Sequence, residues 1–206
     1  HGEPNDINAH PHVSMHGEFV LVHNGIIENY AALKQRLEAY GYTFQSETDS
    51  EVLVNVIEYI YLHYHKSFEA AVRSIVIGAY AICVYPLKNP TQLIAARLGS
   101  PLVIGVDSGN YYVASDAIPI AKYTRNIVLL DDGDLVVMTH DSILLKKDDD
   151  SSQLPNVTTV DWDIENTALG NFSHYMLKEI YEQPNSIQDT CRGRINDVHD
   201  FVTLGG

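Results

Sequence analysis

Hydrophobic and polar positions along this chain change their spacing twice, and each spacing predicts a different kind of element. Residues 18–23 form a short run of apolar and β-branched side chains, which is typical of a strand. Asn24-Gly25 follows at once and predicts that the strand ends there in a tight turn. Residues 29–41 then carry leucines four positions apart between an N-cap asparagine and a final glycine, and this arrangement predicts a helix.

A second helix is predicted to begin at Thr48-Asp49-Ser50-Glu51, which has the spacing of a capping box. Behind it, apolar residues recur at helical spacing between Val52 and Ile60. A third helix is predicted over residues 68–77, and a brief strand over residues 43–46. The first part of the chain is therefore predicted to place helices after one main strand.

From residue 79 the pattern changes to short apolar or alternating runs separated by turn signals such as Asp131-Asp132-Gly133. Strands are predicted over residues 79–85, 92–97, 102–106, 111–114, 126–130, 134–139 and 142–146. Helices followed by many neighbouring strands predict an α+β fold with mostly antiparallel sheets. A last helix is predicted over residues 174–181, ended by Pro184, and residues 193–206 are predicted to be a linker.

Charge and cysteine usage narrow the possible partners and location. The chain has 13 Lys+Arg and 27 Asp+Glu and a formal charge of −14, which argues against nucleic acids and anionic membrane surfaces as partners. No apolar run approaches the roughly 20 residues of a membrane span. Cys83 and Cys191 are too few for a disulfide scaffold, so we expect reduced thiols in a cytoplasmic protein.

Three groups of polar residues are candidates for chemistry. His10 and His12 flank a proline and suggest zinc, but ordinary loop histidines are the alternative, and we predict neither a metal nor a cofactor. Asn24 and Gly25 offer side-chain and backbone donors that suit an oxyanion, the alternative being a turn. Asp49 in the first turn of a helix suits a ligand ammonium group, the alternative being helix capping.

Several longer motifs occur in a fixed order along nearly the whole chain. They are His1-Gly2-Glu3-Pro4, Asn8-Ala9-His10-Pro11-His12, His23-Asn24-Gly25-Ile26-Ile27-Glu28-Asn29, Ser46-Glu47-Thr48-Asp49-Ser50-Glu51, Gly99-Ser100-Pro101-Leu102 and His174-Tyr175-Met176-Leu177-Lys178-Glu179-Ile180-Tyr181-Glu182-Gln183-Pro184. In this order and spacing they resemble the glutaminase domain of the glutamine–fructose-6-phosphate aminotransferase (isomerizing) family, also called glucosamine-6-phosphate synthases. The resemblance extends from His1 to about Gly193.

The resemblance implies the fold of the class II glutamine amidotransferases. This is an N-terminal-nucleophile hydrolase type four-layer αββα sandwich with antiparallel sheets, which we expect to be incomplete here at its N-terminus. It implies a partial amidotransferase domain over residues 1–192 and a linker over residues 193–206 toward a sugar isomerase domain. The full-length enzyme is expected to be a homodimer.

The resemblance also implies a mechanism and roles for individual residues. An N-terminal cysteine attacks the side-chain amide of L-glutamine, with the chain's own α-amino group as general base. The Asn24 side chain and the Gly25 N–H match the oxyanion hole, and Asp49 matches the carboxylate that binds the glutamine α-ammonium. His1 and Gly25 belong to the glutamine-binding residues. Ammonia then converts fructose 6-phosphate into glucosamine 6-phosphate in the isomerase domain.

The sequence departs from the family pattern at its beginning. The nucleophilic cysteine and the Arg-Trp-Ala-Thr segment of the family would precede His1, and neither Cys83 nor Cys191 stands at a position that replaces that cysteine. We therefore expect this polypeptide alone to have no glutaminase activity. Two alternatives remain open, namely a non-catalytic binding or regulatory domain of the same fold and a glutaminase domain of another class II amidotransferase.

Overall fold

The computed structural model describes residues 2–73, 78–147, 151–160, 169–192, 194–196 and 201–202. The chain divides into two compact units, His1–Trp162 and Asp163–Gly206, and each is described by itself. The helices of the first unit are α1 (Tyr30–Ala39), α2 (Asp49–Tyr64) and α3 (Phe68–Arg73). Its strands are β1 (His12–Val13), β2 (Phe19–Ile27), β3 (Gly78–Pro86), β4 (Gln92–Leu98), β5 (Val103–Asp107), β6 (Asn110–Ala114), β7 (Asn126–Leu129), β8 (Leu135–Thr139), β9 (Ile143–Lys146), β10 (Ser152–Gln153) and β11 (Thr158–Thr159).

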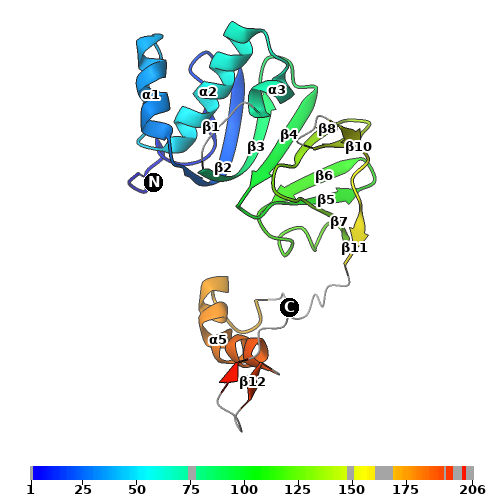
Figure 1. Cartoon of the computed structure of the whole chain (residues 1–206). Helices are drawn as coiled ribbons and strands as arrows, with labels where there is room; N and C mark the ends of the chain where they lie inside the picture. The colour runs from blue at the N-terminus through cyan, green and yellow to red at the C-terminus, as the bar shows by residue number, and fades with distance from the viewer. Residues whose placement is uncertain are drawn as a thin grey trace. The chain divides into compact units, whose positions relative to one another are not determined.

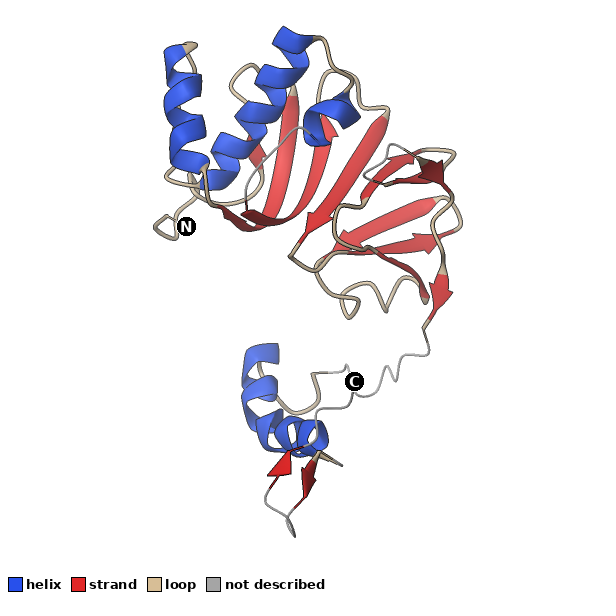
Figure 2. Ribbon diagram, viewed as in Figure 1, coloured by secondary structure: helices blue, strands red, loops and turns tan. Residues whose placement is uncertain are grey.

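The larger sheet of the first unit has seven strands in the order β1-β2-β3-β4-β8-β9-β10, with antiparallel neighbours throughout. The three helices lie on one of its faces (Figures 1 and 2). Between them, Phe19 and Leu21 of β2 pack into one buried apolar cluster with Leu53 and Ile57 of α2. Burial of these large apolar side chains between the helix and the sheet stabilises the packing of α2 against β2.

The smaller sheet has four strands in the order β11-β7-β5-β6. Its Ile104 and Val128 form a second apolar cluster with Ala81, Ala95 and Val136 of the larger sheet, on the face away from the helices. A segment of turns that includes Ala117 and Ile120 packs against Val103 and Ile127 of the smaller sheet as a third cluster. The predicted α+β class with antiparallel sheets is confirmed.

Most predicted elements form near their predicted bounds. Asn29 is the N-cap residue of α1, and Gly41, at φ +91°, lies just beyond its end. Thr48 caps α2, because its side chain accepts a hydrogen bond from the N–H of Glu51 at 3.3 Å. The helix predicted over residues 68–77 forms as α3 over Phe68–Arg73, and residues 74–77 of the prediction lie outside the described part of the chain.

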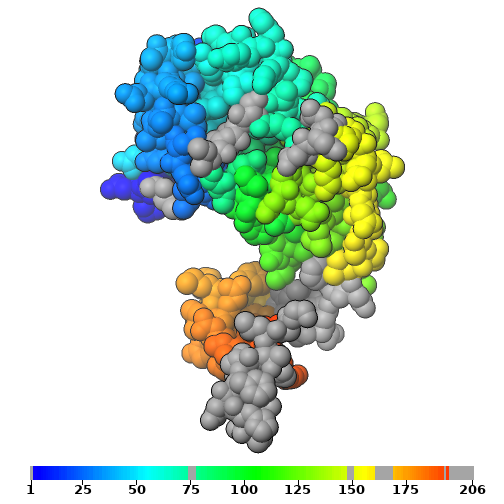
Figure 3. All heavy atoms as spheres, viewed as in Figure 1, coloured from blue at the N-terminus to red at the C-terminus, as the bar shows by residue number. Residues whose placement is uncertain are grey.

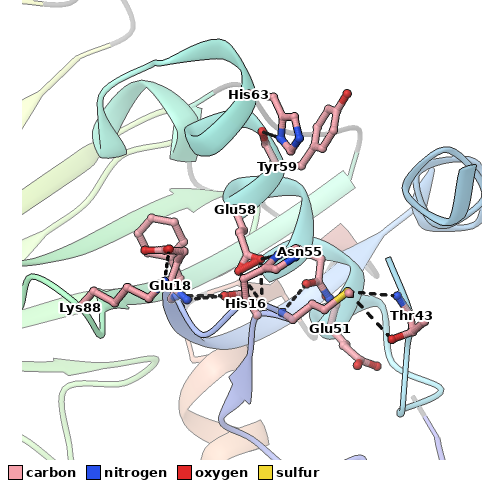
Figure 4. Close-up of polar contacts among 12 residues, drawn as sticks. His16, Glu18, Thr43, Glu51, Asn55, Glu58, Tyr59, His63 and Lys88 are labelled. Carbon is pink, nitrogen blue, oxygen red and sulfur yellow. Dashed lines mark hydrogen bonds and ion pairs between the residues drawn. The ribbon is translucent and has the colours of Figure 1, made fainter. Parts of the chain in front are cut away.

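A turn before β2 is held to the middle of α2 by buried polar groups (Figure 4). The N–H of Met15 donates to Oδ1 of Asn55 at 2.8 Å. The N–H of His16 donates to both carboxylate oxygens of Glu58, and Nδ1 of His16 lies 2.8 Å from Oε2. Because Glu58 is fully buried, these contacts replace the water that its carboxylate would otherwise bind.

Two predictions, one about the end of β2 and one about residues 43–46, are wrong. The strand does not end at Asn24-Gly25, because β2 continues to Ile27 and pairs with β3 over its whole length. Gly25 has a φ of +133°. Glycine tolerates this backbone angle, so the Asn24-Gly25 dipeptide is accommodated inside a strand. Residues 43–46 do not form a strand, since the N–H groups of Gln45 and Ser46 bind the Glu51 carboxylate and not a neighbouring strand.

The second unit contains α5 (Tyr175–Cys191) and a short antiparallel pair of strands, β12 (Ile195–Asn196) and β13 (Phe201–Val202). The prediction that Pro184 ends the helix is wrong, because α5 continues through it. The fixed φ of proline is itself helical, so the helix can continue, although the missing N–H and the crowding of the ring against the preceding turn cost about 3 kcal/mol inside a helix. None of the helices in the described ranges is long and apolar enough to span a bilayer.

Candidate functional site

A pocket of about 630 Å³ opens where the N-terminal loop, β2 and the first turn of α2 meet. Its lining residues are Gly2, Glu3, Pro4, Asn5, Asp6, Asn8, Ala9, His10, His23, Asn24, Gly25, Thr48, Asp49 and Ser50. The N-terminal residues, dark blue in Figure 3, lie on the surface of this unit. Three stretches that are distant in the sequence therefore supply the walls of one cavity.

Gly25 lies inside β2 and directly opposite Tyr80 of β3. Its φ is +133°, and a Cβ atom added to it would stand 2.1 Å from the carbonyl oxygen of Ala79. Both the backbone angle and the close approach require glycine at this position. Asn24 precedes Gly25 in β2, and its side chain is exposed. Both residues line the pocket while they remain part of the strand.

Asp49 is the first residue of α2. Its Oδ2 accepts a hydrogen bond from the N–H of Ile27 at 2.8 Å, which joins the end of β2 to the start of the helix. A negative charge at this place interacts favourably with the positive end of the α2 dipole. Asp49 thus presents a fixed negative charge to the same cavity that Asn24 and Gly25 line.

Two histidines meet at the hydroxyl of Ser50. Its Oγ lies 3.2 Å from Nε2 of His10 and 3.0 Å from Nδ1 of His23. Burial lowers the pKa of His23, an effect that the Asp49 carboxylate opposes and the neighbouring His10 reinforces. His23 therefore stays neutral at physiological pH.

His12 makes a similar contact with Thr48, the cap residue of α2 two positions before Ser50. Its Nε2 lies 3.0 Å from Oγ1 of Thr48, and its ring packs edge-to-face on that of His10 at 5.4 Å between centroids. Burial, with His10 beside it, lowers the pKa of His12 as well. His10 and His12, which suggested zinc, thus each contact a hydroxyl at the start of α2 through Nε2, His10 that of Ser50 and His12 that of the cap residue Thr48.

The N-terminal wall of the pocket is held by one side-chain amide. Asn8 donates from Nδ2 to the carbonyl of Glu3 at 3.0 Å and accepts at Oδ1 from the N–H of Glu47 at 3.0 Å. A Cβ on Gly2 would stand 2.2 Å from Nδ2 of Asn8, so the amide packs directly on that glycine. Glu47 directly precedes the Thr48-Asp49 helix start, which links this wall to the rest of the site.

The charges around the cavity are of one sign. Glu3, Asp6 and Asp49 carry carboxylates, and no lysine or arginine is found among the lining residues that the structure describes. A ligand with an ammonium group is favoured in such a field, and the amide of Asn24 adds a donor for a ligand oxygen. Chemically, the arrangement is suited to a small polar molecule that bears both groups.

The structure brings together three of the four residues predicted for the site, Asn24, Gly25 and Asp49. The fourth, His1, lies outside the described residues. Sequence reasoning missed the contact of His23 and Ser50, although the first adjoins Asn24 and the second stands inside the capping box.

Neither cysteine lines the pocket. Cys83 lies in the middle of β3, where burial raises the pKa of its thiol to about 12, so it is protonated and unreactive at neutral pH. Cys191 is the last residue of α5, in the second unit.

Residues 5–122 match the model of the glutamine amidotransferase domain family. The chain belongs to this family. The match includes Asn24, Gly25 and Asp49 and ends within the first unit. The matched residues thus include most of those that line the pocket.

Curated relatives of this amidotransferase domain are named glutamine–fructose-6-phosphate aminotransferase (isomerizing). The relative from Chlorobaculum tepidum is 47% identical over 210 residues, covering 100% of this chain and 34% of the relative. The relative from Bacteroides thetaiotaomicron is 46% identical over 208 residues, covering 99% and 34%. The chain therefore spans about a third of the length of these relatives.

Solved amidotransferases share the fold. The glutamine phosphoribosylpyrophosphate amidotransferase from B. subtilis, complexed with ADP and GMP, is similar with a TM-score of 0.58 and 26% identity over 69% of this chain and 32% of its own. A second structure, described as the allosteric regulatory enzyme of purine biosynthesis, has a TM-score of 0.55 and 25% identity over 68% and 31%. These similarities confirm the predicted N-terminal-nucleophile class of this amidotransferase domain.

Proposed function

We propose that the pocket binds L-glutamine and that this chain supplies the binding and oxyanion groups of a glutaminase. The observation that carries the proposal is the meeting of Asn24, Gly25 and Asp49 around one cavity of about 630 Å³. Asn24 and Gly25 come from a strand, and Asp49 comes from the first turn of a helix that begins 22 positions after that strand ends. A domain without catalysis has no physical need for that combination.

Asp49 binds the α-ammonium group of glutamine in this proposal. Its carboxylate is fixed by the Ile27 N–H and faces a cavity without lining lysine or arginine in the described residues. A charge-assisted hydrogen bond of this kind is about twice as strong as a neutral one. His1 is proposed to join the same binding region.

Asn24 and Gly25 hold the oxyanion in this proposal. The tetrahedral intermediate of amide hydrolysis places negative charge on the former carbonyl oxygen, which the Asn24 amide and the Gly25 N–H stabilise. Gly25 is suited to this role because no Cβ stands between its backbone and a ligand. The rigid pairing of β2 with β3 fixes both donors before the substrate arrives.

The nucleophile is proposed to be a cysteine that precedes His1 in the full-length protein. On the face of β2 away from the helices, Val22 is 42% exposed and Ile26 is 60% exposed. Strand β6 is an edge of the smaller sheet, and an edge strand can accept a further strand. In this proposal the segment that carries the cysteine covers this apolar face of β2 and ends beside Asn24.

The full-length protein is proposed to transfer the released ammonia to fructose 6-phosphate and to form glucosamine 6-phosphate. Support comes from the relatives with that name, one of which is 47% identical, against 26% for the phosphoribosylpyrophosphate enzyme. In this proposal residues 1–192 belong to the amidotransferase domain, and residues 193–206 lead to a sugar isomerase domain.

A cytoplasmic location and a homodimer of the full-length protein complete the proposal. Cys83 and Cys191 are both free thiols, as is usual in a reducing compartment. Sedimentation of the full-length protein tests whether it is a homodimer. A monomer at all concentrations would contradict it.

Product analysis tests the acceptor. Full-length protein incubated with glutamine and fructose 6-phosphate is expected to form glucosamine 6-phosphate in an amount equal to the glutamate released. Phosphoribosyl pyrophosphate is expected to give no aminated product. Amination of the phosphoribosyl compound instead would assign the chain to another amidotransferase branch.

A further inference from the structure

Ser50 stands between the two halves of the pocket. It directly follows Asp49 on α2, and its Oγ lies 3.0 Å from Nδ1 of His23, which directly precedes Asn24 on β2. A single hydrogen bond thus connects the two residue pairs that line the cavity from opposite elements. Ser50 and His23 are each only 4% exposed, so water does not readily replace either partner.

The same hydroxyl also holds the third wall. Nε2 of His10 lies 3.2 Å from Oγ of Ser50, and His10 belongs to the N-terminal segment that lines the cavity. A hydroxyl has one proton, so with both imidazoles neutral it donates to one ring nitrogen and accepts from the other. Serine and threonine can do both at once, whereas alanine can do neither.

From this geometry we propose that Ser50 is a positioning residue, which sets the distance between Asn24 and Asp49 through His23 and fixes the N-terminal wall through His10. The role rests on the proposed glutaminase function, because it concerns the site that binds glutamine. Ser50 acts through its neighbours and touches no reacting atom. The Ile27–Asp49 hydrogen bond, at 2.8 Å, lies on the other side of Asp49 and depends on the same placement of the helix start.

Kinetics of the full-length protein test the role. Ser50→Ala is expected to raise the KM for glutamine roughly 10-fold or more, with a smaller fall in kcat, because displaced supporting groups cost about this much. Ser50→Thr keeps the hydroxyl and is expected to restore KM to within about threefold. Ser14→Ala is the matched control, since Ser14 is also buried but binds the N–H groups of Glu18 and Phe19 away from the pocket.

A merely structural serine gives a different pattern. In that case Ser50→Ala and Ser14→Ala lower stability alike and leave the KM for glutamine unchanged, which would overturn the proposal. Failure of Ser50→Thr to restore KM would also overturn it, because the hydroxyl would then not be the group that matters.

Amide hydrogen exchange in this chain separates the inference from the proposed function. Ser50→Ala is expected to speed exchange of the Ile27 N–H at least about tenfold, as the helix start loosens, while Ser14→Ala leaves it unchanged. Unchanged exchange at Ile27 would overturn the positioning role even if glutamine is hydrolysed. Faster exchange in a protein that never hydrolyses glutamine would overturn the proposed function and keep the positioning role.

Discussion

The backbone N–H of Ile27 donates a 2.8 Å hydrogen bond to Oδ2 of Asp49. This bond joins the end of the strand that carries Asn24 and Gly25 to the first residue of α2. It fixes the carboxylate relative to the donors without consuming its charge. The bond therefore allows the charge of Asp49 and its hydrogen-bonding capacity to be tested separately.

Asp49→Asn removes the charge and retains an oxygen that can accept from Ile27. The KM for glutamine of the full-length protein is expected to rise roughly 10- to 100-fold, because a hydrogen bond to a charged group contributes about 1.5–3 kcal/mol. Steady-state kinetics measure it. Asp141→Asn, at an exposed position, is the control. An unchanged KM in Asp49→Asn would rule out this carboxylate as the ammonium partner.

Gly25→Ala places a Cβ atom against the carbonyl of Ala79 and strains a backbone at φ +133°. We expect a loss of about 3 kcal/mol in the free energy of unfolding, measured in urea. Gly109→Ala is the control, because Gly109 also has positive φ, at +86°, but no atom within 4 Å of its added Cβ. Its expected loss is about 1 kcal/mol. Equal losses would show that the contact with Ala79 does not constrain β2.

Sequence patterns predicted the helix starts and most strands because these depend on local chemistry. The Thr48 cap and the apolar run along residues 134–139 are visible in neighbouring residues, and both elements form. The local sequence Asn24-Gly25 predicts a turn because the dipeptide is ambiguous without its partner strand. The pairing of Gly25 with Tyr80 depends on residues 55 positions away, which no local pattern contains.

The candidate site shows the same division. Motif resemblance pointed to Asn24, Gly25 and Asp49, and the structure places all three around one cavity. The motif resemblance does not indicate that Ser50 contacts two imidazoles, because His10 and His23 reach Ser50 only through tertiary packing. Pro184 gives a different kind of error: the local preference of proline for helix ends predicts a stop there, but α5 continues through it.

Glu58→Ala removes a fully buried carboxylate that accepts two hydrogen bonds from the N–H of His16 and contacts its ring. The free energy of unfolding is expected to fall by about 2–4 kcal/mol, since the His16 N–H loses its partner and a cavity forms. Urea unfolding measures it. Glu69→Ala, which breaks a partly exposed pair with Lys146, is expected to cost under about 1 kcal/mol. A cost at Glu58 no larger than at Glu69 would contradict the anchoring role.

Stability is expected to fall as the pH drops below about 6.5, because burial lowers the pKa of both His12 and His23 from that value. Each binds fewer protons in the folded than in the unfolded chain, so acid favours unfolding, by at most about 1.4 kcal/mol per pH unit for each group. His23→Asn should flatten this slope between pH 7 and 5. His140→Asn, which removes an exposed imidazole whose pKa Asp141 raises, should not. A slope unchanged by His23→Asn would contradict the buried, neutral state of His23.

Glutamate release from L-glutamine tests the central claim most directly, with the full-length protein and the 206-residue chain assayed side by side. The account predicts turnover by the full-length protein, loss of most of it at subsaturating glutamine in Asp49→Asn, and no turnover by the chain alone. Turnover by the chain alone would show that the nucleophile lies within these residues. No turnover by the full-length protein would show that the pocket is not a glutaminase site.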